Sequence, residues 1–115
     1  MAYVGFVPKI SAEEAALYVK DNDVVAFCGA GGGITEASVL IDALAERYKK
    51  TSRPKYLTFW HSTGLGDRAD KGMSPLAQKG LVKRVIGGHW GQSPRLADMA
   101  DRNEIEAYNL PMGVM

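Results

Sequence analysis

The sequence has a single cysteine, no excess of either charge and no long apolar run. One thiol cannot form an internal disulfide, and chains without disulfides are typical of reducing compartments. Lys and Arg number 14 against 13 Asp and Glu, so the chain lacks the basic excess of proteins that bind nucleic acid or anionic membranes. No apolar stretch approaches the roughly 18–20 residues that a helix needs to span a bilayer. We therefore expect a cytoplasmic protein that binds neither nucleic acid nor a membrane.

Patterns that bind metals and nucleotide cofactors are also missing. No group of His, Cys, Asp and Glu has the spacing of a metal site. A P-loop is excluded because no Gly-Lys-Ser/Thr sequence follows the glycine-rich segment. A dinucleotide fingerprint would need a small residue in place of Ile34 and an acidic residue just after Trp60, and neither is there. We expect no bound metal and no resident cofactor.

Glycine, by contrast, is concentrated in one informative segment. Gly29 and the run Gly31–Gly33 follow directly on an apolar segment at 24–28, and Ile34 then begins an amphipathic pattern. Glycine permits positive φ and lets another group approach the backbone without a Cβ in the way. A turn between a strand and a helix also presents backbone N–H groups at the positive end of the helix dipole. This pattern predicts a site for an anion or for a developing negative charge.

The rest of the chain alternates between apolar runs and segments with helical periodicity. Strands are predicted at 24–28, 56–60, 82–86 and 105–108, and helices at 11–19, 34–48, 74–79 and 93–102. Strands separated by helices are typical of a parallel α/β sheet, and continuously apolar strands indicate that helices cover both faces. The length is sufficient for one domain.

Three unusual loops, at 29–33, 61–66 and 87–92, each follow a predicted strand. Ligands of parallel sheets bind outside the carboxyl ends of the strands, so we expect these loops to meet along one edge. His61 and His89 could form an acid–base pair, or each could simply hydrogen-bond a loop backbone, and for His61 the second reading is favoured. Cys28 reads as a small buried residue that ends its strand. Glu36 reads as a first-turn residue that stabilises the helix dipole.

Several motifs, in order, resemble those of family I coenzyme A transferases, in the branch that acts on acetate, short-chain ketoacids and propionate. The glycine-rich motif spans 21–33, and the others lie at 63–70, 80–84, 88–94 and 107–111. The resemblance runs from about Pro8 to the last residue. It implies a Rossmann-like three-layer α/β fold that is incomplete here, with residues 1–115 forming the N-terminal fragment of the first CoA-transferase domain.

The resemblance also implies a reaction, in which coenzyme A moves from an acyl-CoA to a free short-chain carboxylate. Coenzyme A is then a substrate and not a cofactor. In the family, the attacking glutamate lies in a Glu-x-Gly motif of the C-terminal half, and no such motif occurs in this sequence. The chain alone is therefore expected to be inactive and to need the remainder of the transferase, and an open sheet edge favours a homo-oligomer. The alternative is a non-catalytic remnant or a subunit module that requires a partner chain.

Together, the glycine-rich segment and the resemblance suggest which residues form the site. Backbone N–H groups could stabilise the oxyanion of each thioester or anhydride step. The oxyanion candidates are Gly29, Gly31, Gly32 and Gly33. The substrate-binding candidates are Ala30, Gly64, Leu65, Gly66, His89, Trp90, Gly91 and Gln92. No catalytic side chain is assigned within this chain, and a bulky residue at Gly31 is predicted to abolish transfer.

Overall fold

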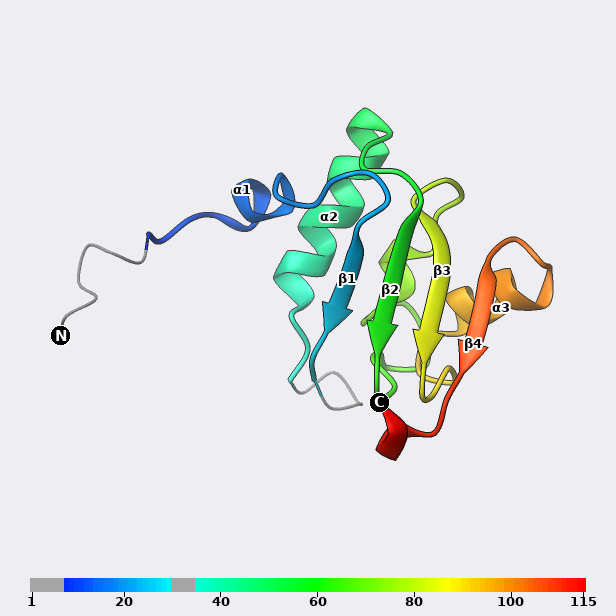
Figure 1. Cartoon of the computed structure of the whole chain (residues 1–115). Helices are drawn as coiled ribbons and strands as arrows, with labels where there is room; N and C mark the ends of the chain where they lie inside the picture. The colour runs from blue at the N-terminus through cyan, green and yellow to red at the C-terminus, as the bar shows by residue number, and fades with distance from the viewer. Residues whose placement is uncertain (1–7, 30–34) are drawn as a thin grey trace, which may run out of the picture.

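The computed structural model describes residues 8–29 and 35–115. Its centre is a four-stranded parallel sheet in which the strands lie in chain order (Figure 1). The strands are β1 (Val24–Phe27), β2 (Leu57–His61), β3 (Val82–Gly87) and β4 (Glu106–Asn109). Each overlaps its predicted segment, and the predicted α/β class with parallel pairing is confirmed.

One α-helix precedes β1, two α-helices and a short 3₁₀ helix lie between the strands, and a second 3₁₀ helix follows β4. They are α1 (Ala12–Ala16), α2 (Ser38–Thr51), η1 (Ser74–Leu76), α3 (Pro94–Asp101) and η2 (Met112–Val114). The predicted capping box is present, because the Glu14 amide donates to Ser11 Oγ at 3.1 Å and the Ser11 amide donates to a Glu14 carboxylate oxygen at 3.5 Å. No helix in the described ranges is long and apolar enough to span a membrane.

The beginning of α2 differs from the prediction. The helix begins at Ser38 and Ala37 is its N-cap, so Glu36 lies before the helix and the expected first-turn role of Glu36 is wrong. The carboxylate of Glu36 instead accepts a hydrogen bond from the Gly66 amide at 2.6 Å. Glu36 therefore bonds to the backbone of a distant loop and is not part of the first turn of α2. Helical periodicity in the sequence could not predict this partner. The predicted starting residue, Ile34, lies outside the described residues.

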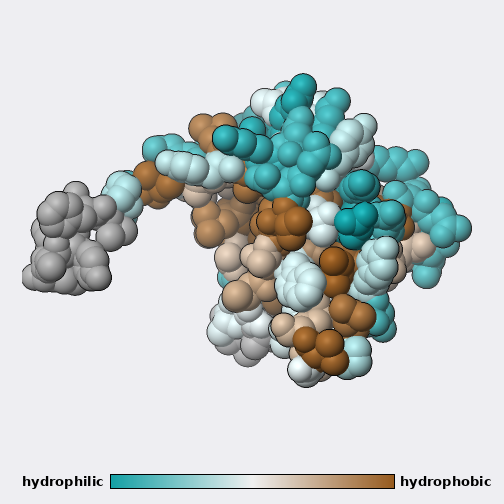
Figure 2. All heavy atoms as spheres, viewed as in Figure 1, coloured by the Kyte–Doolittle hydropathy of each residue, from teal (hydrophilic) through white to brown (hydrophobic). Residues whose placement is uncertain are grey.

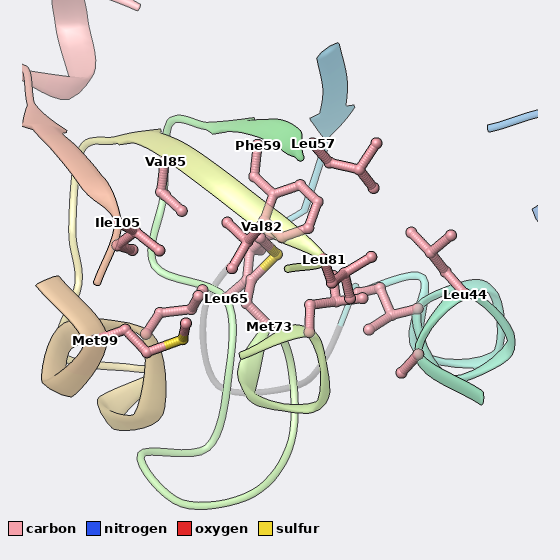
Figure 3. Packing of buried hydrophobic residues seen from close by; sticks show 14 residues of the cluster. Leu44, Leu57, Phe59, Leu65, Met73, Leu81, Val82, Val85, Met99 and Ile105 are labelled. Atoms are coloured by element: carbon pink, nitrogen blue, oxygen red, sulfur yellow. The ribbon is translucent and has the colours of Figure 1, made fainter. Parts of the chain in front are cut away.

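One face of the sheet is covered. Helices α2 and α3 lie behind the sheet in Figure 1, and side chains from these helices and from η1 pack onto it in Figure 3. Leu57, Phe59 and Val85 point into this layer and are 0% exposed. The cluster comprises Ile41, Leu44, Ala45, Leu57, Phe59, Leu65, Met73, Leu76, Leu81, Val82, Val85, Leu96, Met99 and Ile105.

On the opposite face of the sheet, no helix lies among the described residues. Val24 is 67% exposed and Tyr108 49% exposed, while Trp60 and Ile86 are half-buried. Apolar side chains gather over this face in Figure 2, which shares the viewpoint of Figure 1. The expectation that helices cover both faces of the sheet is therefore wrong for the described part of the chain.

Cys28 is a further departure from the prediction. The thiol residue is exposed and not buried as expected. Strand β1 ends at Phe27, and Cys28 follows it and lines the apolar cavity between α1, β1 and α2. Because β1 is an edge strand of the sheet, the residue that follows it is not enclosed by neighbouring strands on both sides.

Candidate functional site

All three post-strand loops leave the sheet at the same edge. The pairing register aligns Phe27 of β1 with His61 of β2, and His61 with Gly87 of β3. In a parallel sheet, such aligned residues mark the carboxyl edge, where ligands bind. The predicted convergence of the loops is therefore confirmed for the residues that the structure describes. We call this set of loops, at 28–29, 35–36, 61–66 and 87–93, the rim.

Two side-chain hydrogen bonds fasten the first loop to the second. The Thr63 hydroxyl donates to the Gly29 carbonyl at 2.5 Å. The Gly66 amide donates to the Glu36 carboxylate at 2.6 Å. Gly29 and Glu36 lie on opposite sides of the 30–34 segment, so the described residues on both sides of the glycine-rich turn are joined to the loop that follows β2.

The second loop is joined in turn to the third. The Gly88 amide donates to the His61 carbonyl at 3.2 Å, and the Arg68 amide donates to the Gln92 carbonyl at 3.0 Å. The hydroxyl of Ser93, which is buried, donates to the Leu65 carbonyl. These bonds make the rim a continuous unit across the ends of three strands.

The glycines of the second loop permit this close approach. A Cβ on Gly66 would lie 2.2 Å from the Gln92 carbonyl oxygen, and Gly66 has a φ of +146° that L side chains rarely adopt. A Cβ on Gly64 would lie 2.5 Å from Cγ of Gln92 and 3.2 Å from Nδ1 of His89. Backbone of the second loop therefore lies directly against side chain and backbone of the third.

His61 is buried, with 3% of its surface exposed. Its Nδ1 lies 2.7 Å from the Thr63 carbonyl, which can only accept, so Nδ1 carries a proton. Burial lowers the pKa of His61 below its usual value, the bond to Thr63 opposes this shift, and the nearby His89 adds to it. The interpretation of His61 as a residue that hydrogen-bonds a loop backbone is confirmed.

His89 is exposed at the third loop. Its Nδ1 accepts a hydrogen bond from the Gly91 amide at 3.0 Å, so in the neutral ring the proton is on Nε2. The ring lies beside Gly91, where a Cβ would come within 2.9 Å of Cε1. His89 thus combines a fixed ring orientation with exposure at the rim, as a substrate contact would require.

The other candidates differ in their burial. Leu65 is 1% exposed and belongs to the core cluster. It also lines an apolar cavity of about 370 Å³ between α1, β1 and α2. Trp90 packs against the same core, and its buried indole N–H has no hydrogen-bond acceptor among the described residues. The side chains of Leu65 and Trp90 therefore pack from the rim into or against the core, whereas Gln92 is half-buried.

Four candidates lie outside the described residues, namely Ala30, Gly31, Gly32 and Gly33. Among the residues that are described, no group of three or more His, Cys, Asp and Glu side chains could hold a metal ion. The rim therefore offers backbone amides, one exposed imidazole and one half-buried amide side chain. Such a set suits the recognition of a carbonyl or carboxylate group.

The family model for coenzyme A transferase matches residues 9–115. The chain belongs to the coenzyme A transferase family. The chain is 57% identical over 111 residues to the acetate CoA-transferase YdiF of Escherichia coli O157:H7, an alignment that covers 96% of the chain and 21% of YdiF. It is 32% identical over 108 residues to the caffeate CoA-transferase of Acetobacterium woodii, with 92% and 20% covered.

A solved structure agrees with these relatives. The chain superposes on a crystal structure of the acyl-CoA transferase YdiF from E. coli O157:H7, a thioester complex with CoA, with a TM-score of 0.92 and 57% identity. The alignment covers 94% of this chain and 22% of that structure. The chain thus spans about a fifth of the length of the relatives that it matches.

Three residues join the loops of the rim through their side chains, namely Glu36, Thr63 and Ser93. The sequence did not predict this role for any of them. Ser93 is the N-cap of α3, as predicted, but its hydroxyl makes no capping bond and donates to Leu65 instead. Each of the three is a polar residue next to a strand-end loop. That signal is weak, because such residues are common in any turn.

Proposed function

We propose that the whole protein transfers coenzyme A from an acyl-CoA to a short-chain carboxylate such as acetate, propionate or a ketoacid. The continuous rim at the carboxyl edge is the observation that carries this proposal. Membership of the coenzyme A transferase family supports it, as does the similarity to an acetate CoA-transferase over nearly the whole chain. Coenzyme A is a substrate in this reaction, and no resident cofactor is needed.

Charge development in the reaction assigns roles to the rim. Attack on a thioester carbonyl places negative charge on its oxygen, and preorganised N–H donors stabilise that charge by about 3–4 kcal/mol each. The amides of Gly66, Gly88 and Gly91 already donate to Glu36, His61 and His89. We keep the oxyanion role for the glycine-rich first loop, with Gly29, Gly31, Gly32 and Gly33 as its candidate residues.

In this proposal the third loop contacts the acyl group and the carboxylate. His89, with its ring held by Gly91, and Gln92, beside Gly64, are the polar side chains available there. The nucleophilic glutamate comes from the remainder of the protein, since the chain spans about a fifth of its relatives. We also propose a cytoplasmic homo-oligomer, on the grounds of the single cysteine and the open edge of β1.

A chimera tests the function directly. The segment of E. coli YdiF that aligns with this chain is replaced by the chain itself, and transfer of CoA from acetyl-CoA to propionate is measured. The proposal expects CoA transfer within about tenfold of that of YdiF. A folded chimera of native oligomeric state with no transfer would overturn the proposal and favour a non-catalytic module.

A substitution within the chimera tests the rim. Gln92→Ala removes the amide group at the rim surface and should lower kcat/KM at least about tenfold, or 1.4 kcal/mol of transition-state stabilisation. Gln78→Ala is the matched control, because the Gln78 side chain donates to the Ala45 and Pro75 carbonyls beneath α2 and lies away from the rim. The control should lower stability and leave transfer unchanged. Equal activity of the two variants would remove Gln92 from the site.

A further inference from the structure

The glycine-rich turn is bracketed by two side-chain bonds that link residues far apart in sequence. Thr63 is 34 residues from Gly29, and its hydroxyl donates to the Gly29 carbonyl at 2.5 Å. Glu36 is 30 residues from Gly66, and its carboxylate accepts from the Gly66 amide at 2.6 Å. Both bonds are part-buried. Each is short for its type, since about 2.7–2.8 Å is usual for O–H···O and about 2.9–3.0 Å for N–H···O. Each joins a residue flanking the 30–34 segment to the loop after β2.

The Thr63 bond is anchored in the core. The buried His61 ring donates from Nδ1 to the Thr63 carbonyl at 2.7 Å. The ring is also packed against Gly87, where a Cβ would come within 2.7 Å of Nε2. His61 therefore fixes the Thr63 backbone, and Thr63 fixes the Gly29 carbonyl. The orientation of Gly29, just before the 30–34 segment, is thus fixed by contacts at the ends of β2 and β3.

The Glu36 bond has an equally firm partner. Gly66 lies so close to the third loop that a Cβ would meet the Gln92 carbonyl oxygen at 2.2 Å and the Lys71 carbonyl oxygen at 3.0 Å. The neighbouring Arg68 amide is bonded to that same Gln92 carbonyl. Because the backbone around Gly66 is crowded, the direction of its N–H group is fixed. A charged carboxylate acceptor also makes this hydrogen bond stronger than one to a neutral acceptor. Glu36 is therefore held in place just before α2 begins.

From this geometry we propose that Thr63 and Glu36 are positioning residues, which set the distance between the first and second loops of the acyl site. The proposal rests on the proposed transferase function. Neither residue belongs to the apolar core cluster, and the bonds of both end on rim backbone. Displacement of a reacting group by about 1 Å can lower a rate roughly 10²-fold. Loss of either bond should therefore reduce turnover more than substrate binding.

The test uses the YdiF chimera that carries this chain. Thr63→Val removes the hydroxyl at nearly constant volume and should lower kcat at least about tenfold, with KM for acyl-CoA changed less than about threefold. Thr63→Ser restores the hydroxyl and should recover most of the turnover. Thr51→Val is the matched control, because the Thr51 hydroxyl donates to the Arg47 carbonyl at 2.8 Å near the end of α2, away from the rim. The control should leave kcat unchanged.

Glu36 is tested by a second pair of variants. Glu36→Ala removes the acceptor of the Gly66 amide, so hydrogen exchange at Gly66 should accelerate at least about tenfold and kcat should fall. Glu36→Gln retains an oxygen acceptor and should lose less of both. Glu46→Ala is the control, because Glu46 is an exposed residue of α2 that pairs with Lys49 at 3.3 Å. It should change neither measurement.

These outcomes separate the two proposals. If the unsubstituted chimera shows no transfer, the proposed function fails, and exchange at Gly66 still tests the positioning role. If the chimera transfers CoA but Thr63→Val and Glu36→Ala keep full kcat, the positioning role is overturned. Unchanged exchange at Gly66 in Glu36→Ala overturns the Glu36 part in either case. A uniform rise in KM with constant kcat would make these residues binding residues and would also contradict the inference.

Discussion

The two faces of the sheet are built from neighbouring residues of the same strands, yet they differ in almost every respect. Phe59 of β2 and Val85 of β3 are 0% exposed beneath the helices, whereas the next residues, Trp60 and Ile86, are half-buried on the opposite face. Trp60 and Ile86 are as apolar as the buried residues beside them, although the uncovered face also carries the Arg84–Glu106 ion pair. The difference therefore arises from what covers each face and not from the strand residues themselves, so a continuous apolar run cannot say which face is covered.

The rim belongs to the covered side. His61, Leu65 and Ser93 are all buried, and all three make hydrogen bonds within or between the loops. His61 and Ser93 bond to backbone carbonyls of the second loop, and Leu65 supplies the carbonyl to which Ser93 donates. The side chains of the covered face thus form the buried core and also hold the loops of the rim in place. In the described part of the chain, the side chains of the uncovered face do not hold these loops.

The largest effect is expected from truncation of matched residues on the two faces. Phe59→Ala removes a fully buried ring that contacts Phe27 edge-to-face with centroids 5.4 Å apart. Such a loss typically costs about 3–5 kcal/mol. Trp60→Ala, on the uncovered face, should cost less than half as much. Urea unfolding of the 115-residue chain measures both, and equal losses would contradict the distinction between the faces.

An intermediate effect is expected from pH. Burial holds the pKa of His61 below its value of about 6.5 in the unfolded chain. The unfolded chain then binds more protons, so stability is complete above about pH 6.5 and falls as pH decreases towards the folded pKa. Urea midpoints at pH 5 and pH 8 should differ accordingly. His61→Asn keeps a donor for Thr63 and cannot ionise, so it should flatten this dependence.

The exposed His89 supplies the control. His89→Asn changes a residue on the surface of the rim and should leave most of the pH dependence in place. A variant series in which His89→Asn flattens the profile and His61→Asn does not would show that the buried ring is not the titrating group.

Local sequence signals predicted the positions of the strands and helices but not every length, since the helix predicted at 74–79 is a 3₁₀ helix at Ser74–Leu76. The capping box at Ser11 and the Ser93-Pro94 start of α3 are encoded within a few neighbouring residues, and both are present. The four strands were found from apolar runs bounded by turn residues, and the shared edge of their loops follows from parallel pairing. These features depend on short-range chemistry or on topology, so one sequence is enough to infer them.

Long-range partners were not predictable in the same way. Glu36 has a helical spacing and a typical helix-start composition, yet its partner is Gly66, 30 residues away. Cys28 has the apolar character of a buried residue and is exposed. Nothing local distinguishes the two outcomes for either residue. Each depends on which distant backbone or helix arrives beside it.

The smallest effect is expected from an ion pair on the uncovered face. Arg84 of β3 pairs in register with Glu106 of β4, and the guanidinium lies 2.7 Å from the carboxylate. The side chains are 33% and 49% exposed, so water and salt screen the attraction. A double-mutant cycle of Arg84→Ala and Glu106→Ala in the 115-residue chain should give a coupling of about 0.2–1 kcal/mol, decreasing with added salt. A larger coupling energy that does not change with added salt would show that this face is shielded from solvent. It would contradict the difference in exposure between the two faces.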